Sequence, residues 1–276
     1  MNRANVGWHL ANMKDNEHLI AGSASGVGPS PAIWSNCPYL PIMFDPTKGF
    51  VYFNDFFTGF TDLAASGWGG DLYLYEEATA TLKNLPTVPG GIIEISGTTA
   101  VDDGATVRIP CLQCEPREGT TIYMEWRCNV EAGGGQAFMG LMSDAENAPV
   151  SSSDAISTDD DYVGFFRDSD TTDLYWSVGV CDGSSSETAD DEVLTDESAY
   201  HKYGIILRGI GAVSGSRAEF YYDGELVYVA DDVDDLPLLL MCPVFQVHGD
   251  GTDNPIINLD WIRVAVHNVD SHCRES

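Results

Sequence analysis

Basic residues are scarce in this sequence: 13 Lys and Arg stand against 43 Asp and Glu, and the formal net charge is −30. DNA- and RNA-binding proteins need clustered Lys and Arg to contact phosphates, so the composition excludes a nucleic-acid partner. No apolar run reaches the length of a membrane-spanning helix, and no membrane partner is expected. An apolar stretch of signal-peptide type does not follow Met1, so classical secretion is not expected.

Motifs of several enzyme and metal-site classes are also missing. The seven cysteines are an odd and scattered set, and Cys111 and Cys114 form a single CxxC without the second pair of a zinc site. We therefore expect most cysteines to be reduced and buried. HExxH, HxxxH and GxSxG patterns do not occur, so the residues indicate no metalloprotease or serine hydrolase.

The negative charge is unevenly distributed along the chain. In residues 1–50 the charges cancel, because three basic residues balance three acidic ones (Arg3, Lys14 and Lys48 against Asp15, Glu17 and Asp45). All of the excess acid therefore lies in residues 51–276. A surface of that charge keeps a protein soluble and repels polyanions.

Residues 1–49 are rich in proline and glycine, which predicts an extended arm rather than regular structure. The arm is too apolar to stay in water, so it packs either on the protein's own body or on a partner. We favour the partner, and the residues expected to bind it are Trp8, Ile33, Trp34, Tyr39, Leu40 and Phe44.

From residue 50 onward, short strand patterns follow one another, separated by turn signals. Residues 121–130 alternate, with Ile122, Met124, Trp126, Cys128 and Val130 on one face, as in a half-buried antiparallel strand. Asp223-Gly224 between two strand patterns predicts a hairpin turn. We therefore predict an all-β, two-sheet antiparallel β-sandwich over residues 50–267, followed by a tail over 268–276.

Several segments together resemble the concanavalin A-like (laminin-G-like) jelly-roll family. They are VYFNDFF (51–57) with Trp68 downstream, IYMEWRCNV (122–130), AFMGLMSD (137–144), DYVGFFRD (161–168), YHKYGIILR (200–208), AEFYYDGELV (218–227) and NLDWIRVAV (258–266). Such a domain behind a Pro/Gly-rich arm resembles virion structural proteins of tailed bacteriophages. The resemblance implies a surface or binding role.

From this resemblance we expect a non-enzymatic capsid decoration (cement) protein on the outer capsid surface of a virion. Its arm would dock on the major capsid protein, and homo-oligomers such as trimers would suit the capsid symmetry. The alternative is a carbohydrate-binding tail adhesin or lectin that depends on calcium. No other cofactor is expected.

An enzyme of this fold would need two carboxylates that flank the scissile glycosidic bond. The Glu-x-Asp-x-x-Glu motif that jelly-roll glucanases carry on one strand is absent. Glu125 and Glu131 share a strand, but six residues of strand rise separate them by about 20 Å, which is too far for a catalytic pair.

Two further features are candidate ligand sites. Asp159, Asp160 and Asp161 lie in the acidic stretch 144–197 and either bind calcium through their oxygens or form a solvated surface. Some aromatic residues could stack on sugars, although most must fill the core; the set is Trp68, Tyr73, Tyr75, Trp126, Trp176, Tyr221, Tyr222 and Trp261. Trp176, between the two most acidic segments, is the expected ligand contact.

Overall fold

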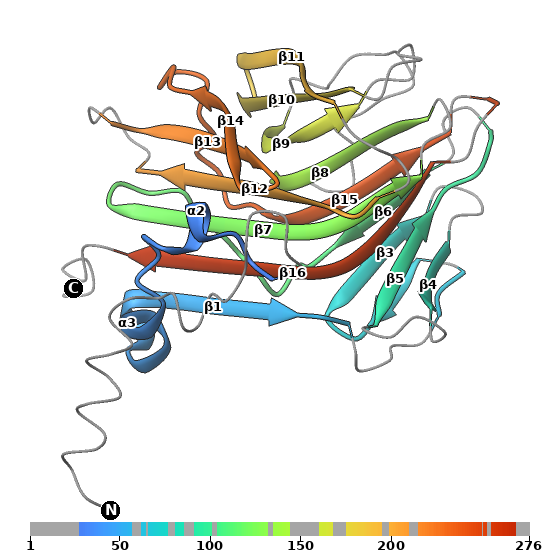
Figure 1. The fold of residues 1–276 in the computed structure, drawn as a ribbon, viewed down its shortest axis with the longest axis horizontal. Coiled ribbons are helices and arrows are strands. Elements are labelled where there is room, and N and C mark those ends of the chain that lie inside the picture. The colour runs from blue at the N-terminus through green and yellow to red at the C-terminus, as the bar shows by residue number, and fades with distance from the viewer. Residues whose placement is uncertain are drawn as a thin grey trace, which may run out of the picture.

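The computed structural model shows two antiparallel sheets packed face to face (Figure 1). It describes residues 28–56, 62–64, 66–76, 81–85, 91–100, 104–131, 135–143, 160–167, 175–194, 199–209, 215–249, 251–252 and 255–268. The expectations for Trp8 and Asp159 lie outside these residues. The predicted sandwich is confirmed, and its first and last strands are Gly49–Asn54 and Ile256–Asn268.

Sheet A contains eight strands. They are β1 (Gly49–Asn54), β4 (Thr81–Leu85), β5 (Ile92–Ser96), β7 (Thr120–Glu131), β12 (His201–Arg208), β13 (Arg217–Tyr222), β14 (Glu225–Ala230) and β16 (Ile256–Asn268). Their order is β14-β13-β12-β7-β16-β5-β4, and β1 also pairs with β16. The first and last strands of the chain are therefore neighbours.

Sheet B also contains eight strands. They are β2 (Gly67–Gly69), β3 (Leu72–Glu76), β6 (Gly104–Arg108), β8 (Gln136–Met142), β9 (Asp161–Arg167), β10 (Tyr175–Asp182), β11 (Ser186–Leu194) and β15 (Cys242–His248). Their order is β11-β10-β9-β8-β15-β6-β3-β2. Sequence neighbours such as β6 and β7 lie in different sheets, as the jelly-roll pattern requires.

The main core fills the space between the sheets, and strand alternation determines which residues enter it. The five residues predicted to share one face of β7 all lie in this core. Trp126 is at its centre, stacked on Tyr203 with ring centroids 5.8 Å apart and edge-on to Phe165 and Phe245. A strand face buried in this way leaves the opposite face of each sheet, its outward face, to carry function.

The described part of the segment before the first strand, residues 28–48, is not extended, in contrast to what its prolines predicted. It contains helix α2 (Pro31–Trp34), helix α3 (Tyr39–Phe44) and a 3₁₀ turn, η2 (Pro46–Lys48). Pro31 and Pro46 stand in the first turn of their helices, where a backbone N–H has no helical partner, so proline starts these turns without loss. Within the described residues, no helix is both long and apolar enough to span a membrane.

Candidate functional site

The outward face of sheet B gathers aromatic and polar side chains from neighbouring strands. Tyr73 and Tyr75 on β3 lie opposite Arg108 and Thr106 on β6, respectively. On the far side of β3, Trp68 of β2 lies opposite Tyr73. We call Trp68, Tyr73, Tyr75 and Arg108 the aromatic platform.

The aromatic platform is held together by ring contacts. The Trp68 and Tyr73 rings meet edge to face, with centroids 5.2 Å apart and planes inclined at 70°. The Arg108 guanidinium lies 4.9 Å from the centre of the Tyr73 ring, within cation–π distance. Trp68 nevertheless keeps 61% of its surface exposed. A large exposed indole with its neighbours fixed in place is a preformed contact surface for a flat apolar ligand.

Beside the platform lies a buried polar group on β15. Gln246 lies opposite Thr106 of β6, and its Nε2 is 2.6 Å from Nε2 of His248. An amide nitrogen donates, so His248 accepts this bond at Nε2 and carries its proton on Nδ1. Gln246 Oε1 is buried and has no hydrogen-bond partner within the described part of the chain. A water or a ligand hydroxyl would satisfy this oxygen.

Over β8, β9 and β15, the outward face is covered by aromatic rings, one of which packs on a glycine. A Cβ at Gly164 would meet the Phe138 ring at 2.5 Å, so the ring lies against the bare backbone of β9. Phe138 packs with Tyr162 and Val244 in a cluster of its own on this face. The β2-β3-β6 end of the outward face, where the platform lies, is outside this cluster and stays open.

From β2 to β9, the described part of this face holds no carboxylate pair. Among the described outward-facing residues of β2, β3, β6, β8, β9 and β15 there is no Asp or Glu, although the chain has 43. The two glutamates considered from the sequence, Glu125 and Glu131, belong to β7 in the other sheet. Two-carboxylate glycoside hydrolysis therefore has no pair of groups on the described part of this face.

Part of the outward face of sheet A, over β12, β7 and β1, is covered by residues 28–48, which we call the strap (Figure 1). Ile33 and Trp34 of the strap are fully buried against Tyr123, Ile206 and other residues of sheet A. A Cβ at Gly204 would meet Ile33 Cδ1 at 2.1 Å, so the glycine is what admits this side chain. Ile33 and Trp34 therefore have no surface for a partner, which contradicts the role predicted for them. Phe44 is exposed, and Tyr39 and Leu40 are half-buried; their predicted role in partner binding stays a prediction.

A buried carboxylate anchors the strap. Glu125 accepts hydrogen bonds from the Ser30 N–H, at 3.0 Å to each oxygen, and from Trp34 Nε1–H at 2.6 Å. Nearby, Lys202 Nζ donates to the Gly28 carbonyl at 3.1 Å. Burial raises the pKa of Glu125, and these N–H donors oppose the shift. Sequence reasoning rejected Glu125 as half of a catalytic pair and missed this anchoring role, because no local pattern links it to Ser30, which lies 95 residues away in the chain.

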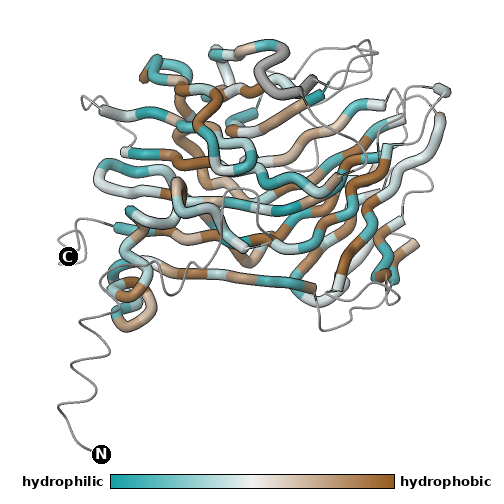
Figure 2. The backbone as a smooth tube through the Cα atoms, viewed as in Figure 1, coloured by the Kyte–Doolittle hydropathy of each residue, from teal (hydrophilic) through white to brown (hydrophobic). Residues whose placement is uncertain are grey.

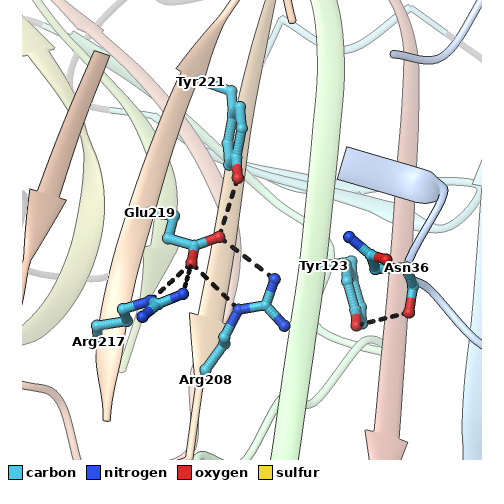
Figure 3. A network of polar contacts seen from close by, with 6 residues as sticks. All are labelled: Asn36, Tyr123, Arg208, Arg217, Glu219 and Tyr221. Atoms are coloured by element: carbon cyan, nitrogen blue, oxygen red, sulfur yellow. Dashed lines mark hydrogen bonds and ion pairs between the residues drawn. The ribbon is translucent and has the colours of Figure 1, made fainter. Parts of the chain in front are cut away.

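A second carboxylate on the same face joins the β12-β13 pair (Figure 3). Glu219 accepts hydrogen bonds from Arg208, Arg217 and the Tyr221 hydroxyl, the last at 2.9 Å. Close by, the Tyr123 hydroxyl donates to the Asn36 carbonyl of the strap at 3.3 Å. Burial raises the pKa of Glu219, but its hydrogen-bond donors outweigh this and hold the pKa below its ordinary value.

This lowered pKa predicts a pH-dependent stability. The charged form of Glu219 is favoured in the folded protein, so its contribution is present above the ordinary glutamate pKa and is lost as pH falls through the lowered value. Glu219→Gln should therefore cost about 1–3 kcal/mol near neutral pH and progressively less in acid. Urea unfolding at a series of pH values measures this difference. A cost that is independent of pH would contradict the assignment.

Trp176 lies in the core and not at a ligand site. It is fully buried on the inward face of β10, in phase with Val178 and Val180, and its ring centroid is 5.7 Å from that of Tyr203. The predicted ligand contact is therefore wrong, because alternation along β10 turns Trp176 toward the other sheet.

The predicted calcium ligands do not form a described metal site. Asp161 is buried, and its Oδ2 accepts the backbone N–H groups of Leu238 and Leu239 at 2.6 and 2.7 Å. These bonds fix the loop between β14 and β15. Among the described residues no group of three or more His, Cys, Asp or Glu is placed to hold a metal ion. Asp160 is described beside Asp161, but the pair gains no third ligand there.

The sequence matches no known family model and no curated protein. Solved structures do resemble the fold. A beta-glucanase of Bacillus licheniformis has a TM-score of 0.52 and 10% identity over 78% of this chain and 97% of its own. A protein of unknown function from Shewanella oneidensis has a TM-score of 0.53 and 13% identity, over 83% of this chain and 90% of its own.

Peanut lectin, solved with a nine-residue peptide, has a TM-score of 0.48 and 12% identity over 78% of this chain and 97% of its own. At these identities the likeness concerns the fold alone. The likeness to the beta-glucanase, together with the two packed antiparallel sheets, shows a jelly-roll sandwich fold, as the sequence segments implied.

Proposed function

We propose that this protein binds a carbohydrate chain on the aromatic platform and does not cleave it. Sugar rings present apolar C–H faces that pack on aromatic rings, while their hydroxyls need fixed hydrogen-bond partners. The platform supplies Trp68 and Tyr73 for stacking and the Arg108 guanidinium as a donor. The sequence-based alternative of a carbohydrate-binding protein is thus preferred to the capsid decoration protein.

The exposure of Trp68 is the observation that carries this proposal. A sugar that covers this indole, which is 61% exposed, removes apolar surface from water, and this favours binding. The ring contact with Tyr73 already limits the side-chain motion of Trp68, so binding costs less conformational entropy. The absence of Asp and Glu from the described outward-facing strand positions of β2, β3, β6, β8, β9 and β15 supports binding without hydrolysis. The placement on a virion stays a prediction, and so does docking on a capsid protein.

Binding to a glycan array, followed by calorimetry with the best-bound oligosaccharide, tests the proposal. Trp68→Ala should weaken binding at least about tenfold, equivalent to roughly 1.4 kcal/mol. Phe44→Ala is the matched control, since it removes an exposed aromatic residue from the other sheet's side and should leave the affinity unchanged. Equal affinities of wild type and Trp68→Ala would contradict the proposed site.

The same titration repeated with EDTA addresses the calcium-dependent form of the lectin hypothesis. The platform contains no carboxylate ligand for calcium, so we expect the affinity to be unchanged when EDTA is present. Loss of binding in EDTA, restored by added calcium, would instead place a metal in the binding site.

A further inference from the structure

An exposed apolar surface lies where helix α3 meets strand β1. Met43 and Phe44 on α3 are 57% and 73% exposed, and Phe53 on β1 is 48% exposed. Arg263 of the neighbouring β16 lies 5.1 Å from the centre of the Phe53 ring, which keeps this ring on the outward face. Figure 2 shows hydrophobic residues in α3, beside β1. We call Met43, Phe44 and Phe53 the α3-β1 surface.

The α3-β1 surface lies in a stretch without net charge. Residues 28–54 contain one acidic and one basic residue, Asp45 and Lys48, in a chain whose net charge is −30. Two copies of such a chain repel each other over most of their surfaces. Electrostatic repulsion therefore opposes a contact between copies least in this stretch, where the charges cancel and apolar side chains are exposed.

Strand β1 also offers an open edge. Within the described residues it pairs with β16 and with no other strand, and it is six residues long. The unpaired N–H and C=O groups of an edge strand are a template for another strand. A two-fold axis beside β1 would pair the β1 strands of two copies in antiparallel orientation. This pairing would join the two A sheets and bring both α3-β1 surfaces into the same interface.

From these observations we propose that a second copy of this chain docks on the α3-β1 surface, forming a two-fold dimer. This inference is independent of the proposed glycan binding, because the aromatic platform lies on the other sheet. A second exposed apolar segment, Leu238–Leu240, is less suited to self-association: the aspartates at 231, 232, 234 and 235 precede it, and two copies would bring these charges together.

Sedimentation velocity of the full chain measures the association. We expect a species of twice the 29.9 kDa chain mass, and its dissociation constant should fall when NaCl is raised from about 0.02 M to about 0.5 M, because salt screens the repulsion between copies. Phe44→Asp should weaken the dimer at least about tenfold. Leu239→Asp adds the same charge at an exposed apolar position and should not weaken it.

Circular dichroism and urea unfolding confirm that both variants remain folded, as expected for exposed positions. A wild-type chain that stays monomeric at about 100 µM in high salt would overturn the proposal. An equal effect of both variants on the dissociation constant would overturn it as well, since dimerisation would then depend on the net charge of the chain and not on the α3-β1 surface. Neither result bears on glycan binding, which Trp68→Ala tests separately.

Discussion

Glu125→Ala is expected to lower the free energy of unfolding by about 3–5 kcal/mol, the usual cost of removing one partner from a buried charged network. The substitution removes the acceptor of the Ser30 N–H and of Trp34 Nε1–H, and it removes a negative charge that acts on Lys202. Trp34 is fully buried, so its indole N–H finds no water in exchange. At about 2–4 °C per kcal/mol for a chain of this size, the midpoint of thermal unfolding falls by roughly 6–20 °C.

Urea unfolding and limited proteolysis together measure this effect. The strap is held by Glu125, so protease cleavage within residues 28–48 should become faster than cleavage elsewhere. Glu94→Ala is the control: Glu94 pairs with Lys83 at 3.0 Å on the same sheet, but the pair is exposed and is worth at most about 1 kcal/mol. If both variants unfolded at the same urea concentration, the anchoring role of Glu125 would be refuted.

Trp126→Ala is expected to destabilise the protein by about 3–5 kcal/mol, the range for truncating a buried aromatic residue. The indole is fully buried between the sheets and contacts three other aromatic rings, those of Tyr203, Phe165 and Phe245. These rings come from both sheets, so they cannot close the cavity without moving the sheets toward each other.

Trp68→Ala provides the comparison, because it is the same substitution on an exposed residue. It should change the unfolding free energy by no more than about 0.5 kcal/mol, while it should weaken the proposed glycan binding at least about tenfold. Urea midpoints of the two variants, measured side by side, distinguish a core tryptophan from a binding tryptophan. Similar losses of stability in both would mean that Trp68 acts as a packing residue.

The contrast between these tryptophans shows how far strand periodicity predicts position. Alternation placed Trp126 on the inward face of β7 together with Ile122 and Met124, and the structure confirms it. The Asp223-Gly224 hairpin was equally predictable, since both residues have positive φ, as a two-residue turn of this type requires. For Trp176 the same alternation existed, but its acidic flanks suggested solvent and the prediction was wrong.

Contacts between distant segments were not predictable in this way. Glu125 stands between apolar residues on β7, and such a position normally faces water. It is buried because Ser30 and Trp34, from a segment expected to leave the body, supply its hydrogen bonds. Likewise, Trp68, Tyr73 and Arg108 come from three strands, and their closeness depends on the register between β2, β3 and β6.

Composition and periodicity were therefore sufficient for the class of fold, because the inward face of a strand depends on residues two apart in the chain. They also led to the prediction that the protein has no nucleic-acid partner, since net charge does not depend on conformation. The candidate binding face, the anchored strap and the exposed α3-β1 surface depend on which strands become neighbours. Strand order and register are set by packing across the whole chain, so only the tertiary structure decided them.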